Sequence, residues 1–173
     1  MKNLKFSRLF AAMMFVACLA FVGCKQPEDE TKKEVSIYGT WVSASDSWIE
    51  KYVITGSEVK NYGNGNLGYA GDSVEINEVS DSSGYIYMKY TRAFCATHSD
   101  FANTVYTYDE DAPDVGKWYA IYYFDLTDDA VKISAAAGPI TSCDSLEEAK
   151  ETFTVANGYM SKAAGKYSTC TRE

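Results

Sequence analysis

The residues best suited to metal or redox chemistry are three of the five cysteines and the single histidine. Cys95 and His98 have the spacing of a zinc-binding pair, and Cys143 and Cys170 would complete a tetrahedral Cys3His site. A lone Cys-x-x-His pair is a weak zinc signal, whereas cysteines outside the cytoplasm are typical of disulfides. We predict no metal ion or other cofactor, and one disulfide drawn from Cys95, Cys143 and Cys170. A bond to Cys170 is favoured because it would fix the C-terminal tail.

Three other motifs have residue types found in catalytic or ligand sites but lack the surroundings that those sites need. Residues 63–68, Gly-Asn-Gly-Asn-Leu-Gly, match a phosphate-binding pattern, but a strand is predicted after them instead of a helix, so we interpret them as a flexible loop. Residues 109–114 hold four carboxylates without the register of a calcium loop, which is typical of a solvated hairpin loop. His98 adjoins Ser99 and Asp100, but no Gly-x-Ser-x-Gly turn accompanies them. We therefore predict that the chain is not an enzyme.

The N-terminal residues combine a positive start with an apolar run that ends in a cysteine. Residues 9–23 are apolar or small, a length that fits a signal peptide and is short for a transmembrane helix. The run ends in Phe-Val-Gly-Cys, which resembles a bacterial lipobox. Phe21 stands where Leu is usual, as in the relaxed lipoboxes of spirochaete lipoproteins. The resemblance implies cleavage after Gly23 and a lipid on Cys24. The alternative is an ordinary secretory signal with an accidental cysteine.

These features divide the chain into a signal peptide at 1–23, a lipidated cysteine with a flexible tether at 24–34, and one domain at 35–173. The tether has no apolar side chain except Pro27, so it cannot bury enough surface to fold. Cleavage would leave 13 basic and 24 acidic residues, which makes nucleic acid and anionic lipid surfaces poor partners. We expect acyl chains on Cys24 to hold the protein in the cell envelope, at the outer membrane or the cell surface.

The domain is rich in strand-forming residues. Tyr, Trp, Val, Ile and Thr occur in short runs separated by turn-forming residues, the pattern of antiparallel strands. The runs lie at 38–43, 47–55, 58–62, 73–79, 84–94, 117–125 and 130–135, with a weaker one at 103–108. The run at 117–125 is apolar on both faces, as expected for a strand that is covered on each side.

One helix is predicted after the strands. Ser145 and Glu148 form a capping box, and Leu146, Ala149 and Phe153 recur at helical spacing. So short a helix needs tertiary contacts, which means that its apolar face must pack on the sheet. The sequence therefore predicts a mainly β fold, an antiparallel meander of seven or eight strands that closes into a barrel, with one C-terminal helix packed on it.

This arrangement resembles the calycin barrel of the lipocalins. Gly39 and Trp41 match the Gly-x-Trp that opens the first lipocalin strand, whose Trp closes the base of the barrel. Thr127 and Asp128 match the Thr-Asp pair before a late strand, and Arg172 has the place of the basic residue that faces the Trp. The resemblance implies structural roles for Gly39 and Trp41 within a lipocalin-like barrel.

The aromatic residues are the strongest indication of binding. All 14 tyrosines lie in the domain, and buried tyrosines need partners for their hydroxyl groups. We predict that Trp48, Tyr87, Trp118 and Tyr122 line a barrel cavity for a small apolar or amphipathic ligand; plain core packing is the alternative. A second hypothesis is a surface-exposed lipoprotein that binds a host or envelope macromolecule through loops at 63–72 and 95–116, with no internal ligand.

Overall fold

The described part of the chain forms nine strands and one short helix, separated by turn residues. The structure, a computed structural model, describes residues 35–96 and 106–173. The predicted signal peptide, Cys24, the tether and His98 lie outside the described residues, so what is predicted for them remains a prediction. The elements are β1 (Gly39–Ala44), β2 (Ile49–Ile54), β3 (Glu58–Gly63), β4 (Asn66–Ser80), β5 (Ser83–Ala96), β6 (Tyr106–Asp109), β7 (Trp118–Phe124), β8 (Ala130–Ala135), α1 (Leu146–Thr152) and β9 (Ser168–Arg172).

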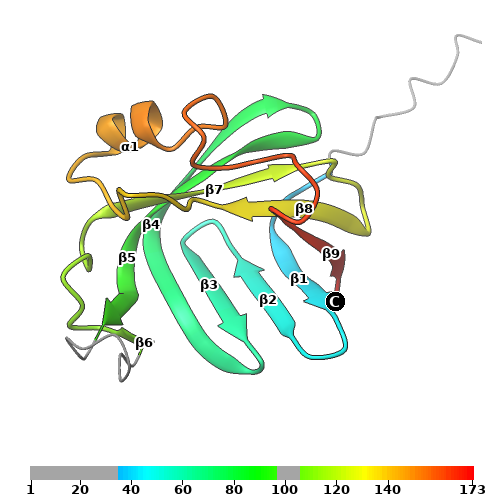
Figure 1. The fold of residues 1–173 in the computed structure, drawn as a ribbon. Helices are drawn as coiled ribbons and strands as arrows, with labels where there is room; N and C mark the ends of the chain where they lie inside the picture. Colours follow the sequence, from blue (N-terminus) through cyan, green and yellow to red (C-terminus); the bar gives the residue numbers. More distant parts are fainter. Residues whose placement is uncertain (1–34, 97–105) are drawn as a thin grey trace, which may run out of the picture. The chain divides into compact units, whose positions relative to one another are not determined.

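Eight of these strands form a closed antiparallel barrel (Figure 1). The ring runs through β1, β2, β3, β4, β5, β7, β8 and β9, and it closes where β9 pairs with β1. β6 lies outside the ring and pairs with the last residues of β5. The predicted mainly β fold, a strand meander closed into a barrel, is confirmed.

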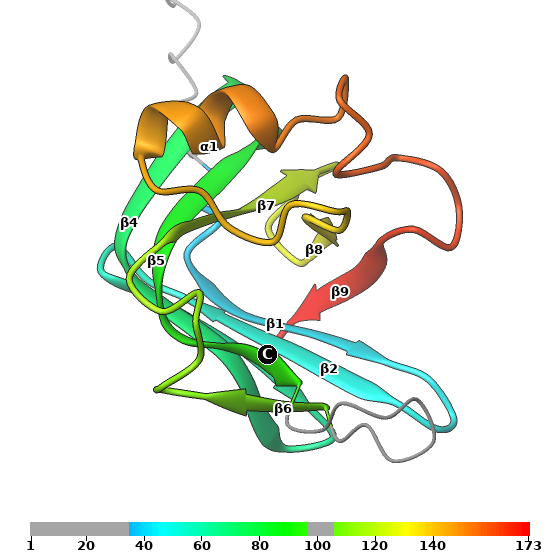
Figure 2. The ribbon, with the colours of Figure 1, turned by 60° about the vertical axis from the view of Figure 1, so that its left-hand side comes forward.

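Antiparallel pairing places alternate turns at opposite ends of the barrel, and we name each end after a residue near it, Trp41 or Glu50. The Trp41 end holds the lead-in at 35–38, the turns at 55–57, 81–82 and 125–129, and the end of β9. The Glu50 end holds the turns at 45–48 and 64–65, together with β6, which pairs with the end of β5 (Figure 2).

The hairpin between β3 and β4 corrects two predictions, the flexible loop at 63–68 and the binding loop at 63–72. Asn64 and Gly65 have φ angles of 48° and 81°, the left-handed values of a two-residue hairpin turn. Gly63 pairs with Asn66 directly across this turn, and β4 begins there. Only a tight turn therefore separates the two strands, and most of the expected loop belongs to β4.

The C-terminal residues require a second correction. The sequence predicts a loose tail after the helix, but Ser168–Arg172 form β9, which pairs with both β8 and β1. The helix therefore precedes the last strand of the barrel, and the tail completes the ring.

Two hydrophobic clusters share the wall formed by β5 and β7. The first fills the barrel interior and draws buried side chains from all eight strands of the ring. The second lies on the outer face of β5 and β7, beneath α1, and includes Tyr87, Tyr122 and Phe153 (Figure 2). β7 is thus covered on both faces, as its apolar sequence predicts.

The helix α1 begins at the predicted capping box. The side-chain oxygen of Ser145 accepts a hydrogen bond from the backbone N–H of Glu148 at 3.1 Å, and Glu148 Oε2 accepts one from the backbone N–H of Asp144 at 3.2 Å. Ala149 and Phe153 are buried in the outer cluster, so the apolar face of the helix packs on the sheet as predicted. In the described part of the chain, no helix is long and apolar enough to cross a membrane.

Candidate functional site

The four aromatic residues predicted to line a barrel cavity lie elsewhere. Tyr87, Trp118 and Tyr122 belong to the cluster on the outer face of β5 and β7, and Trp48 is 53% exposed in the turn between β1 and β2. The predicted interior position of these side chains is wrong, because a strand that is apolar on both faces does not reveal which face points inward.

Large side chains fill the barrel interior instead. Fully buried members of this cluster come from both halves of the ring: Trp41, Tyr52, Ile54, Val59, Ile86, Met88, Ile121, Val131 and Ile133. Protein interiors packed in this way do not admit a ligand without displacing side chains. Candidate sites therefore lie at the two ends of the barrel.

Arg172 and Trp41 close one end. The guanidinium carbon of Arg172 lies 4.1 Å from the centroid of the Trp41 ring, the contact that the lipocalin resemblance implies. The guanidinium also donates hydrogen bonds of 2.6–2.8 Å to three backbone carbonyls, those of Ser36, Tyr38 and Asp128. The indole N–H of Trp41 donates to the carbonyl of Ile37 at 2.7 Å. Gly39 has φ of 142°, and a Cβ there would collide with the Arg172 guanidinium, so this position requires glycine.

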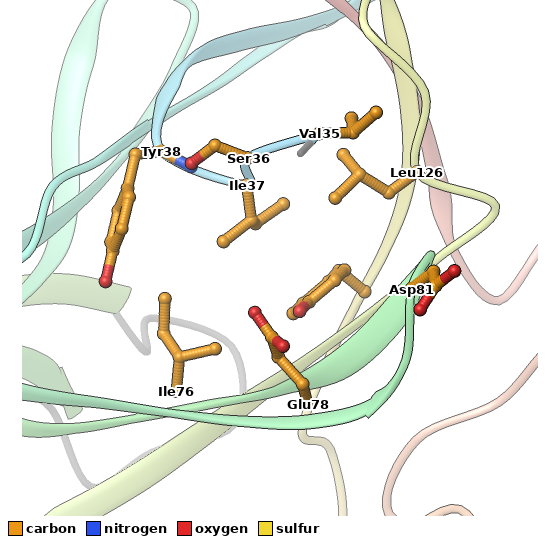
Figure 3. Close-up of a pocket in the computed structure, with 9 residues that line it drawn as sticks. Val35, Ser36, Ile37, Tyr38, Ile76, Glu78, Asp81 and Leu126 are labelled. Atoms are coloured by element: carbon orange, nitrogen blue, oxygen red, sulfur yellow. The ribbon is translucent and has the colours of Figure 1, made fainter. Parts of the chain in front are cut away.

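A pocket of about 420 Å³ lies beside this plug (Figure 3). Its walls come from the lead-in, the end of β4, the turn after β4, the end of β7 and the turn after β7. The lining residues are Val35, Ser36, Ile37, Tyr38, Ile76, Glu78, Asp81, Tyr123 and Leu126. Figure 3 shows the side chains of Ile37 and Leu126 reaching into the space from one side, and the carboxylate of Glu78 reaching into it from β4. The pocket therefore combines an aliphatic side with a larger polar surface that is acidic at one edge.

The acidic edge acts on a buried tyrosine in the pocket wall. Burial raises the pKa of Tyr123 to about 12, and the negative charge of Glu78 and the neighbouring Tyr38 add to the effect. Tyr123 is 2% exposed and keeps its proton at neutral pH. A pocket that offers both apolar side chains and convergent polar groups can hold an amphipathic small ligand. A negative potential at its edge favours a ligand whose polar group is positive or donates hydrogen bonds.

None of these lining residues is among those predicted from sequence to bind a ligand. A weak signal was present, because Val35 and Ile37 alternate with polar residues directly before Gly39. That pattern indicates that the lead-in buries one face, which it does against Ile76 and Leu126. A single sequence could not show that the ends of β4 and β7 lie beside the lead-in.

At the opposite end, Glu50 organises a polar network inside the barrel mouth. Its Oε1 accepts hydrogen bonds from the Tyr52 hydroxyl at 2.7 Å and from Asn61 Nδ2 at 3.1 Å, and its Oε2 accepts one from the Ser168 hydroxyl. Three strands of the ring, β2, β3 and β9, are thereby joined through one half-buried carboxylate. Such a satisfied network stabilises the fold and fixes its partners in one geometry.

Buried tyrosines surround this network. Burial raises the pKa of Tyr52, Tyr69, Tyr90 and Tyr119 well above the usual value, and nearby charges raise it further. The rings of Tyr90 and Tyr119 stack with centroids 4.9 Å apart, and the Tyr119 hydroxyl donates to the Ala136 carbonyl at 2.7 Å. The buried hydroxyl of Tyr69 has no hydrogen-bond partner among the described residues.

The predicted disulfide partners lie in different parts of the structure. Cys143 is a free thiol in the outer cluster, and Cys170 is a free thiol in the interior cluster on β9. Cys95 lies half-buried near the end of β5. Burial raises the pKa of Cys170 to about 12, with a smaller contribution from Glu50, so this thiol is protonated and unreactive in the folded protein. Strand pairing already fixes the C-terminus, so the reason for favouring a bond to Cys170 does not hold.

The loops of the second hypothesis also differ from expectation. The hairpin between β3 and β4 replaces most of the loop at 63–72, and residues 97–105 lie outside the described residues. In the acidic segment 109–114, Asp109 to Asp111 are exposed as predicted, whereas Asp114 is half-buried. Asp114 accepts hydrogen bonds from the hydroxyls of Thr141 at 2.7 Å and Ser142 at 2.8 Å, so it ties this segment to the one before α1.

Comparison of the chain with protein-family models, with curated protein sequences and with solved structures finds no match.

Proposed function

We propose that this chain is a lipid-anchored binding protein of the cell envelope that holds a small amphipathic ligand in the pocket at the Trp41 end. The apolar part of the ligand packs against Ile37, Ile76 and Leu126, and its polar group lies at the carboxylates of Glu78 and Asp81. The observation that carries the proposal is the pairing of aliphatic walls with an acidic edge in one pocket of about 420 Å³.

The packed interior supports a site at the end of the barrel in preference to one at its centre. Ile37, Tyr123 and Leu126 belong to the interior cluster and form the floor of the pocket. The Arg172 and Trp41 plug beside it satisfies its own polar groups. A ligand can therefore occupy the pocket without breaking the core. Binding at this position requires no catalytic group, and we propose a binding role in preference to an enzymatic one.

The anchor belongs to the same proposal. The Gly-Cys pair at the end of the apolar N-terminal run supports lipidation at Cys24, and several acyl chains would hold the protein to a membrane permanently. Growth with an alkyne-labelled fatty acid should label the wild-type protein and leave the Cys24→Ser variant unlabelled. Equal labelling of both would show that Cys24 is not the lipidated residue.

Binding is tested with three probes that share a six-carbon chain: hexylamine, hexanol and hexanoate. Calorimetric titration of the mature chain, residues 24–173 with Cys24→Ser, should give the tightest binding for the amine and the weakest for the carboxylate. Glu78→Gln should weaken hexylamine binding roughly fivefold, because it removes an attraction between charges of about 1 kcal/mol. The affinity for hexanol should stay unchanged.

The matched control is Glu58→Gln, which removes a half-buried carboxylate at the start of β3, at the same end of the barrel, where it pairs with Lys60. This control should bind all three probes like the parent protein. Equal affinity for the amine and the carboxylate, or an unchanged amine affinity in Glu78→Gln, would refute the assignment of the polar group.

A further inference from the structure

A second groove lies at the Glu50 end of the barrel and differs in chemistry from the pocket just described. It has a volume of about 300 Å³ and lies between the β1–β2 turn, the β3–β4 hairpin and β6. Its lining residues are Trp48, Asn61, Gly63, Asn64, Asn66, Leu67, Gly68 and Tyr108. None of these carries a charge, although charged residues make up 23% of the chain.

Trp48 presents a fixed aromatic surface in this groove. Its side chain is 53% exposed, and a Cβ added at Gly63 would lie 2.5 Å from its Cζ2 atom, so the indole lies directly over the Gly63 backbone. The turn that carries Trp48 is closed by hydrogen bonds from the backbone N–H of Ser45 to the Trp48 carbonyl at 2.9 Å and from the Trp48 N–H to the Ser45 hydroxyl at 3.2 Å. The indole therefore has one supported side and a large exposed surface.

Amide side chains provide hydrogen-bonding groups next to the indole. The side-chain oxygen Oδ1 of Asn64 accepts a hydrogen bond from the backbone N–H of Ile49 at 2.8 Å. The backbone N–H of Asn64 donates to the backbone carbonyl of Ile49, also at 2.8 Å. These bonds tie the two hairpins together and orient the exposed Asn64 amide, whose NH2 group has no hydrogen-bond partner among the described residues and can donate to a ligand. Asn66 is exposed in the same groove, and the half-buried Tyr108 forms its wall on the β6 side.

We propose that this groove binds a neutral saccharide. The C–H face of a sugar ring packs on the exposed indole of Trp48, and its hydroxyl groups exchange hydrogen bonds with Asn64, Asn66 and Tyr108. The described residues of the lining carry no charged side chain, which disfavours anionic and cationic ligands, and the amide groups would be left unpaired by an apolar one. This site is independent of the pocket at the Trp41 end and does not rest on the function proposed for it.

The test uses maltotetraose and chitotetraose as neutral probes and a hyaluronan tetrasaccharide as an anionic one. Saturation-transfer NMR and tryptophan fluorescence are recorded on the mature chain with Cys24→Ser. Trp41 is fully buried, Trp118 is half-buried against the outer cluster and Trp48 is 53% exposed, so a fluorescence change on titration that is lost in Trp48→Ala reports Trp48. We expect at least one neutral probe to bind and the anionic probe to bind at least tenfold more weakly.

Two variants test whether the Trp48 indole itself, and not the stability of the fold, is needed for saccharide binding. Trp48→Ala should weaken saccharide binding about tenfold or more. Gly63→Ala should do the same by displacing the indole, whereas Gly56→Ala, a glycine with nothing within 4 Å of an added Cβ, should bind like the parent. All three should keep the circular dichroism spectrum of the parent and its affinity for hexylamine. Failure of both neutral probes to bind the parent protein, or unchanged binding by Trp48→Ala, would overturn the proposal.

Discussion

Different kinds of side-chain interaction close the two ends of the barrel. At the Trp41 end, one cation stacks on one indole, and Arg172 and Trp41 direct their N–H groups to backbone carbonyls. At the Glu50 end, one carboxylate collects side-chain donors from three strands, and the buried Tyr69 hydroxyl lacks a partner among the residues that the structure describes. The first end is a plug with a partly aliphatic, acidic pocket beside it, and the second is a polar mouth with an uncharged groove beside it.

The largest effect that distinguishes the ends should be alkaline unfolding. Tyr52, Tyr69, Tyr90 and Tyr119 have native pKa values above the unfolded value of about 10, so the folded state favours their protonated form. Their stabilising contribution is fully present below about pH 10 and is lost as the pH rises from there towards the native pKa values. Absorbance at 295 nm and circular dichroism should therefore change together, in one cooperative step above about pH 10. Ionisation of all 14 tyrosines with the fold retained would contradict this account.

The two tryptophans at the two ends should differ sharply in their effect on stability. Trp41 is 0% exposed and Trp48 is 53% exposed. Trp41→Ala should lower the free energy of unfolding by about 3–5 kcal/mol, as expected for a buried aromatic residue. Trp48→Ala should change the free energy of unfolding by less than about 0.5 kcal/mol, because the Trp48 ring lies at the surface and is largely exposed to solvent. Urea denaturation of both variants measures the contrast, and equal losses would mean that Trp48 is part of the core.

A smaller effect is expected from the cation of the plug. Arg172→Ala should lower the free energy of unfolding by about 1–2 kcal/mol, since the stacked, half-buried guanidinium binds several carbonyls. Arg172→Lys keeps the charge but loses the planar fork, so it should recover little of this loss. Full recovery in urea denaturation by Arg172→Lys would show that charge alone closes the Trp41 end.

The smallest predicted effect concerns two neighbouring hydroxyl groups at the Glu50 end. Tyr52→Phe removes a donor to Glu50 and should cost about 1 kcal/mol, whereas Tyr69→Phe removes an unpaired hydroxyl and should be neutral or slightly stabilising. Thermal unfolding of the two variants should therefore give opposite or clearly unequal shifts. A loss of stability in Tyr69→Phe as large as in Tyr52→Phe would reveal a partner for the Tyr69 hydroxyl.

The fold was largely predictable because strand signals are local. The runs of β-branched and aromatic residues, the capping box at Ser145 and the Gly39 and Trp41 motif each depend on a few neighbouring residues, and each is found where the sequence indicates. The start of β4 could also have been predicted, because Asn-Gly between two strand-forming runs is a strong hairpin signal. Its nearby glycines lower strand propensity and favour the interpretation as a loop.

The sites were much less predictable because they depend on pairing between distant segments. The pocket joins the lead-in to the ends of β4 and β7, and the Glu50 network joins β2 to β3 and β9. For Tyr87 and Tyr122 the residue types are right for a cavity, but the choice of face depends on how the barrel closes. Trp48 is the predicted ligand residue whose position still fits a binding role, at the surface instead of in the interior.

In the proposed function, an amphipathic ligand binds beside the plug and not within the barrel. The most direct measurement is a titration of the methyl-labelled mature chain with hexylamine, followed by NMR. We predict chemical-shift changes at the methyl groups of Ile37, Ile76 and Leu126, which line the pocket, and none at the fully buried Ile86, Met88 and Ile121. Changes concentrated at those three interior residues, with Ile37, Ile76 and Leu126 unaffected, would contradict the account and place the ligand inside the barrel.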